Sequence, residues 1–117
     1  MPEPAAAFLP LPPATFHILL ALSDDDRHGY GVMQDVAART GGELRLSAGT
    51  LYRSIQRMLE QGLIEEVRRR PPAAEDDERR RYYRITSLGT AVARAETGRL
   101  TGLVKLARAA GLVPRKA

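Results

Sequence analysis

The sequence contains no cysteine and no tryptophan among its 117 residues. Without cysteine there is no disulfide framework and no thiolate metal site. No apolar run approaches the roughly 20 residues that a membrane-spanning helix needs. The opening segment, MPEPAAAFLPLPP, lacks the basic start of a signal peptide and is expected to be a loose arm. Together these absences predict a cytoplasmic protein that does not contact a membrane.

Side chains that commonly perform catalysis are also scarce. The only two histidines, His17 and His28, lie in unrelated contexts, and there is no glycine-rich phosphate loop. An enzyme is therefore the least favoured class. The three aspartates at 24–26 lie next to His28, but adjacent carboxylates cannot all point at one ion from a regular element. No metal and no other cofactor is expected.

Positive charge is concentrated in the second half of the chain. The whole sequence carries a net charge of +4, but residues 1–40 carry −3, residues 68–84 carry +3 and residues 94–117 carry +5. This distribution favours a polyanionic partner, although a solvated surface can have the same composition.

Two helices are expected in the first 40 residues. The segment PATFHILLALS, residues 13–23, has Pro13 in its first turn, where the missing N–H costs nothing. The segment GYGVMQDVAART, residues 29–40, follows acidic residues, and Asp26 or a neighbour is expected to cap it. Gly41 and Gly42 then end it. One apolar side of this second helix is expected to hold Tyr30, Met33, Val36 and Ala37.

A third, short helix is predicted between Ser47, its N-cap, and Gly62, its end. Tyr52 falls at the edge between the two faces of this helix, so that its ring can pack while its hydroxyl stays accessible. Spacing at 100° per residue places the aliphatic side chains on one face: Leu51, Ile55, Met58 and Leu59. The opposite face carries Thr50, Arg53 and Arg57.

The remaining residues predict a β-hairpin and a last helix. LIEEV (63–67) and YYRIT (82–86) have strand composition and flank the polar loop RRRPPAAEDDERRR. Thr86 or Ser87 then caps a helix that runs to about Gly111. Its stripe contains Leu88, Val92, Ala95, Leu103, Leu106 and Ala110, and is predicted to form a dimer interface. Glu96 and Arg99 interrupt the stripe and can pair with each other or with a partner chain.

Three helices, a hairpin and a further helix are the element order of a winged helix-turn-helix, which is a mainly α fold with a small β-hairpin. The predicted parts are a flexible N-terminal arm (1–12), the winged domain (13–87), a C-terminal dimerisation helix (88–112) and a tail (113–117). In this fold the third helix would enter the major groove of double-stranded DNA.

The residues of that helix and of the hairpin suggest distinct roles on DNA. Arg53 is the candidate base reader, because its planar fork can bond guanine at two points. Thr50 could meet a phosphate or a thymine methyl group. Arg79, Arg80 and Arg81 would reach the backbone or the adjacent minor groove.

Three stretches together resemble the PadR-type transcriptional regulators: HGYGVMQDV (28–36), LSAGTLYRSIQRMLEQGLIEE (46–66) and RRRYYRITSLG (79–89). The resemblance extends from about Thr15 to about Ala95. It implies a dimeric winged-helix repressor whose N-terminal and last helices pair the subunits. It places Ser47 to Arg57 against DNA, with Tyr30 and Tyr52 facing DNA or supporting that interface.

The resemblance also implies a small hydrophobic or phenolic effector, since many members respond to phenolic acids or lipophilic drugs. Two features depart from the family pattern: Arg53 stands where proline is frequent, and the hairpin loop is longer.

The resulting prediction is a sequence-specific transcriptional repressor that binds a palindromic operator as a homodimer and is released by a small molecule. The alternative is a protein–protein adaptor built on a winged-helix frame. The acidic EDDE patch in the hairpin loop favours that alternative, because acids beside phosphates are unfavourable.

Overall fold

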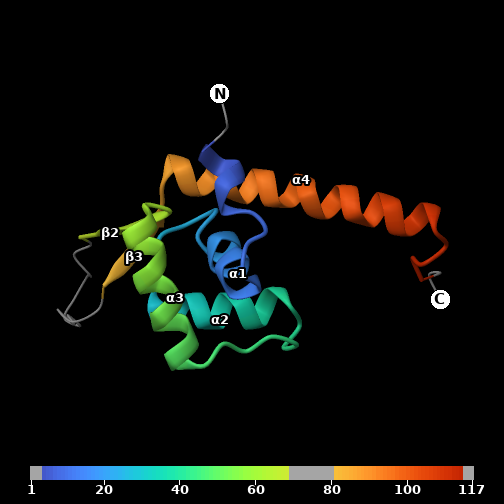
Figure 1. Cartoon of the computed structure of the whole chain (residues 1–117). Helices are drawn as coiled ribbons and strands as arrows, with labels where there is room; N and C mark the ends of the chain where they lie inside the picture. The colour runs from blue at the N-terminus through green and yellow to red at the C-terminus, as the bar shows by residue number, and fades with distance from the viewer. Residues whose placement is uncertain (1–3, 69–80, 115–117) are drawn as a thin grey trace.

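The computed structural model describes residues 4–68 and 81–114, which form a mainly helical fold with a small antiparallel sheet (Figure 1). This architecture confirms the predicted winged helix-turn-helix. In chain order the elements are the 3-10 helix η1 (Pro4–Phe8), α1 (Pro13–Ala21), β1 (Arg27–His28), α2 (Gly29–Arg39), α3 (Ala48–Gln61), β2 (Ile64–Val67), β3 (Tyr82–Ile85) and α4 (Ser87–Ala109).

Helix α1 forms the centre of the molecule and packs against α2, α3 and α4 (Figure 1). Its Ile18 and Leu19 are fully buried. The other fully buried large side chains come from α2, α3, β2, α4 and the residue before β2: Val32, Val36, Leu51, Met58, Leu63, Ile64 and Val92. Because all of these share one core, the burial of apolar surface fixes the orientation of α3 relative to the rest of the fold.

The sheet has the strand order β1-β3-β2, with both pairings antiparallel. The sequence predicted β2 and β3 as a hairpin but not β1, which is only two residues long. The turn before β1 is tied to β3 because Arg84 donates from Nε and Nη2 to the Asp26 carboxylate, at 3.1 and 2.9 Å. These bonds hold the hairpin against the helical part of the fold.

Two predictions about α2 are wrong. Asp26 does not cap this helix, because the helix begins at Gly29 and the cap position belongs to His28, whose Nδ1 accepts from the Gly31 N–H at 3.0 Å. Tyr30 does not share the apolar side, and 60% of it is exposed. The buried residue Val32 lies two positions further on, about 200° around the helix from Tyr30.

The N-terminal segment is not a loose arm within the described residues. Helix η1 packs against α4, and Ala5 and Leu11 are buried in the core. Phe8 and Leu9 also pack against that core. The proline-rich composition is typical of a loose arm, but the burial of its apolar side chains against α4 orders the segment.

Glu96 of α4 lies beneath this N-terminal segment and is only 2% exposed. Arg99 donates to both oxygens of its carboxylate, from Nε and Nη2, each at 2.7 Å. These hydrogen bonds from Arg99, together with its positive charge and the backbone N–H of Leu11, lower the pKa of Glu96. The predicted pairing of Glu96 with Arg99 is confirmed within one chain.

We expect the stability of the protein to depend on the ionisation of Glu96. Because its pKa is lower in the folded than in the unfolded chain, the ion pair stabilises the fold above the ordinary glutamate pKa, roughly 4.3. That stabilisation disappears as the pH falls through the lower folded pKa. Urea unfolding between neutral and acidic pH should therefore show a weaker pH dependence in Glu96→Gln than in the wild type.

The control for that experiment is Glu43→Gln, since Glu43 is exposed and makes no ion pair in the part of the chain that the structure describes. This variant should keep the wild-type pH dependence. If Glu96→Gln also kept it, the ion pair with Arg99 would contribute nothing to stability.

Helix α4 has two different halves. Its first half completes the core, where Val92 is fully buried and Leu88 and Ala95 pack against it. Val92 is therefore not available to a partner subunit, whereas Leu88 and Ala95 are only partly buried. The predicted dimerisation helix (88–112) thus shares its first half with the core of the winged domain. The second half projects away from the body of the molecule (Figure 1) and exposes Leu103 and Leu106.

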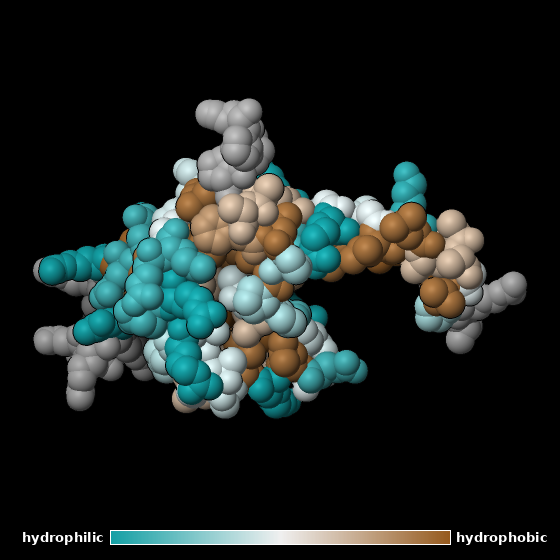
Figure 2. Space-filling view, viewed as in Figure 1, coloured by the Kyte–Doolittle hydropathy of each residue, from teal (hydrophilic) through white to brown (hydrophobic). Residues whose placement is uncertain are grey.

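Hydrophobic residues lie along this projecting half of α4, whereas hydrophilic side chains cover the side formed by α3 and the sheet (Figure 2). Within residues 4–68 and 81–114, none of the helices combines the length and hydropathy required to cross a membrane.

Candidate nucleic-acid interface

Helix α3 is fixed at both ends by local chemistry. The Ser47 hydroxyl accepts from the Thr50 N–H at 3.1 Å, and Gly62 ends the helix with a φ of 79°, a conformation that glycine adopts without strain. Leu51, Ile55 and Met58 anchor its inner face in the core. Both predicted caps and the predicted inner face are confirmed.

The outer face of α3 carries Arg53 and Arg57, which are exposed, and Thr50, which is half-buried. Arginines elsewhere hold the fold together: Arg84 binds Asp26, and Arg99 binds Glu96. By contrast, neither Arg53 nor Arg57 makes a hydrogen bond or ion pair within residues 4–68 and 81–114. Two guanidinium groups that have no partner among the described residues therefore point outward from one helix.

Sequence reasoning missed Gln56, which is exposed one turn after Arg53 on the same side of α3. Its side-chain amide donates to Glu60 at 3.2 Å, so this face also carries one carboxylate. The helical projection that singled out Arg53 places Gln56 about 60° away from it. Hydrogen-bonding capacity, considered together with charge, could have identified it.

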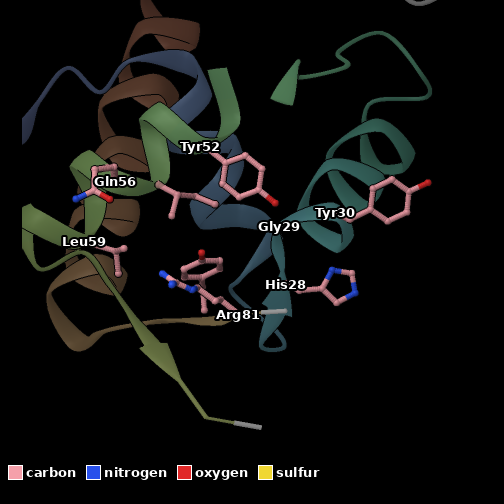
Figure 3. Close-up of a pocket in the computed structure, with 9 residues that line it drawn as sticks. His28, Gly29, Tyr30, Tyr52, Gln56, Leu59 and Arg81 are labelled. Carbon is pink, nitrogen blue, oxygen red and sulfur yellow. The ribbon is translucent and has the colours of Figure 1, made fainter. Parts of the chain in front are cut away.

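Tyr52 joins α3 to the start of α2. A methyl group built on Gly29 would lie 2.3 Å from the Tyr52 Oη and 2.8 Å from its Cζ, so the phenol rests directly on the glycine. Tyr52 remains 49% exposed, as its predicted position at the edge of the helix implies. Figure 3 shows its hydroxyl directed toward Gly29. This contact limits how closely the two helices can approach each other.

Aromatic rings surround the N-terminus of α2. The His28 and Tyr30 rings stack with centroids 6.4 Å apart, and Tyr82 of β3 meets His28 edge-on at 5.3 Å. Tyr30 thus stands on the surface beside a cluster that links α2 to the sheet.

A hollow of about 420 Å³ is lined by residues of α3, β3 and the N-terminus of α2 (Figure 3). Burial of Tyr83 at its base raises the pKa of that phenol. Three predicted site residues, Tyr30, Tyr52 and Arg81, line this one hollow. The remaining lining residues are His28, Gly29, Ile55, Gln56, Leu59 and Tyr83.

Arg81 is the one residue of the predicted arginine cluster that the structure describes, and its Nε lies 3.7 Å from Glu66 Oε2. Arg79 and Arg80 lie outside the described residues. In the described ranges no group of three or more histidine, aspartate or glutamate side chains could hold a metal ion. Asp24, from the acidic run, instead pairs with Arg27 and Arg39.

Comparison with known proteins shows which family this chain resembles. Residues 18–95 match the model of the transcriptional regulator PadR-like family. The chain belongs to that family. Its members are transcriptional regulators and not enzymes, which confirms the prediction that the chain is not an enzyme.

One relative, an uncharacterized protein from Lysinibacillus sphaericus, is 36% identical over 74 residues, which cover 63% of this chain and 65% of that protein. The chain thus matches slightly less than two thirds of that relative.

Solved structures share the fold. A transcriptional regulator from Clostridium thermocellum superposes with a TM-score of 0.68 at 24% identity, over 81% of this chain and 86% of that chain. Bacillus subtilis PadR, solved in complex with operator DNA, has a TM-score of 0.61 at 17% identity, over 74% of this chain and 47% of that chain.

Proposed function

We propose that this PadR-like regulator represses transcription by binding operator DNA as a homodimer through the outer face of α3. The observation that carries the proposal is the pair of exposed guanidinium groups, Arg53 and Arg57, that lack a partner in the described ranges. An ionised group with no partner on a rigid convex helix suits a polyanion whose grooves accept a helix. The proposal includes action in the cytoplasm.

The roles on DNA follow from position along α3. Arg53 lies in the N-terminal half, which enters the major groove in helix-turn-helix proteins, and its fork matches O6 and N7 of guanine. Thr50, one turn earlier, would contact a phosphate or a thymine methyl group. Ser47 and Tyr30 lie where the DNA backbone would pass. Arg57, one turn after Arg53, would bind phosphate and thus affect all sequences alike.

Support for a DNA-bound state comes from Bacillus subtilis PadR, a structural relative that was solved with operator DNA. The wing would contribute Arg81, together with Arg79 and Arg80, to the backbone or the minor groove. Positive charge concentrated in residues 68–84 would increase affinity for any duplex, whereas α3 would supply the choice of sequence.

The proposal includes release by a small hydrophobic or phenolic molecule. The hollow beside α3 falls within the size range of small-molecule sites, and apolar side chains from Ile55 and Leu59 line it. A molecule bound there would lie next to the DNA-binding face and would compete with the duplex.

A protein–protein adaptor is the second candidate. Glu65 and Glu66 are exposed on β2, and Glu60 is exposed near the end of α3. Carboxylates near a phosphate backbone weaken binding. Gel-shift titration with fragments of the source genome separates the two functions, since an adaptor would retain no fragment even at low salt.

Two matched variants test the DNA-binding roles. Once a genomic fragment has been selected, Arg53→Ala should weaken binding to it by about 1–3 kcal/mol while changing affinity for random DNA much less. Arg57→Ala should lower the affinity for the selected fragment and for random DNA to a similar degree, and should reduce the salt dependence of binding. Fluorescence anisotropy across a salt series measures both quantities. Equal behaviour of the two variants on both fragments would contradict the assigned roles.

A further inference from the structure

Gly49 is the second residue of α3 and lies exposed on the same face as Arg53. Glycine within a helix reduces stability by up to about 1 kcal/mol relative to alanine. The backbone at Gly49 does not have the positive φ found at Gly62, which only glycine adopts easily. Backbone conformation therefore does not require a glycine at position 49.

Packing does not require it either. At Gly89 a methyl group would lie 2.1 Å from a backbone carbonyl oxygen, and at Gly29 it would overlap a phenol. At Gly49 the nearest atoms to such a methyl group all belong to the Arg53 side chain, with Nη1 at 3.3 Å and Cζ at 3.9 Å. A guanidinium at the end of a flexible side chain can move aside, so the fold would accept alanine here.

The direction of the Arg53 side chain explains this contact. Long side chains on a helix lean toward its N-terminus, and Arg53 lies four residues after Gly49, on the same stripe. Its guanidinium consequently rests over the bare backbone of the first turn. The N-terminal end of a helix carries partial positive charge, which does not stabilise a cation. Neither packing within the fold nor the helix dipole therefore stabilises the Arg53 guanidinium in this position.

We propose that Gly49 is a positioning residue: its missing side chain lets the Arg53 guanidinium lie along the first turn of α3, aligned to read a guanine. This inference rests on the proposed DNA-binding function. A side chain at position 49 would displace the guanidinium away from the helix axis. A bidentate contact with O6 and N7 is sensitive to such a displacement because both hydrogen bonds share one planar fork.

The test first locates the base that Arg53 reads. Each base pair of the selected fragment is replaced in turn, and binding by the wild type and by Arg53→Ala is compared. The contacted pair is the one whose replacement weakens the wild type but has no further effect on Arg53→Ala, as in a double-mutant cycle. Gly49→Ala should then lose about 5-fold or more in its preference for that pair, the lower limit of a bidentate contact.

Thermal unfolding provides a readout that separates positioning from structural damage. Gly49→Ala should melt at or above the wild-type temperature while discriminating less between base pairs. Gly98→Ala is the matched control, since Gly98 is also exposed within a helix and a methyl group there would meet nothing within 4 Å. It should melt in the same way and keep full discrimination. In an Arg53→Ala background, Gly49→Ala should change binding by less than about 2-fold.

Three outcomes would overturn the inference. If Gly49→Ala kept wild-type discrimination at the base read by Arg53, the glycine would not position that side chain, although DNA binding would stand. If Gly49→Ala lowered the affinity for every fragment equally, also in the Arg53→Ala background, Gly49 would instead make room for the duplex itself. If the wild type retained no fragment, the proposed function would fail and this inference with it.

Discussion

Gly89→Ala is expected to destabilise the protein by about 3 kcal/mol, the upper part of the range for overpacking a core. A methyl group at Gly89 would lie 2.1 Å from the carbonyl oxygen of Leu63 and 2.9 Å from Cγ1 of Ile85. The Leu63 oxygen is backbone and cannot rotate away. Relief of the clash requires the first turn of α4 to move off the strands, and urea unfolding would measure the loss.

Moving α4 would also break the hydrogen bonds at its start. The Leu63 carbonyl accepts from the Thr86 N–H at 3.1 Å and from the Thr86 hydroxyl at 3.0 Å, and that hydroxyl caps the helix by accepting from the Gly89 N–H at 3.0 Å. Gly98→Ala, later in α4, should instead keep or raise stability. Equal stability of the two variants would show that the close approach at Gly89 can relax freely.

Helical periodicity alone does not show that Gly89, unlike Gly98, packs against a backbone carbonyl, because both glycines fall within the same predicted helix. Local features were predictable because they depend on residues close in the sequence. Ser47 begins α3 and Gly62 ends it through contacts with residues a few positions away. The outer face carrying Arg53 and Arg57 followed from helical periodicity alone.

Features that depend on distant residues were not predictable from the sequence. Asp26 looked like a helix cap, but it pairs with Arg84, 58 residues away. Glu96 was expected to interrupt an apolar stripe, and only the packing of the N-terminal segment shows that it is buried. Within the candidate interface, Tyr52 of α3 contacts Gly29 of α2. Helical periodicity does not give the angle at which these two helices pack, so this contact was not predictable either.

The same limit applies to α4, where periodicity identified an apolar stripe but not what covers it. The structure divides the stripe: Val92 is in the core, whereas Leu103 is 48% and Leu106 is 68% exposed on the projecting half. An apolar surface on a helix that leaves the body is unfavourable in water unless another molecule covers it. A second copy of the same helix is the occupant that the proposed homodimer supplies.

Leu106→Glu is therefore expected to convert the dimer into a monomer and to lower operator affinity by about 100-fold or more. In the proposed dimer each subunit would contact only one half of a palindrome, so binding of the second half would depend on the link between subunits. Size-exclusion chromatography with light scattering would measure the mass, and fluorescence anisotropy the affinity. Thermal unfolding of the variant, measured at a concentration where the wild type is dimeric, should lose the concentration dependence expected of a dimer.

Thr101→Glu provides the matched control, because Thr101 is exposed on the same projecting half but lies on the opposite side of the helix from Leu103 and Leu106. It adds the same charge near DNA, so any loss from charge repulsion alone appears in both variants. A dimeric Leu106→Glu protein would show that this face is not the interface. A monomeric variant that still bound the operator with full affinity would show that one α3 is sufficient, and the argument for a palindromic operator would then fail.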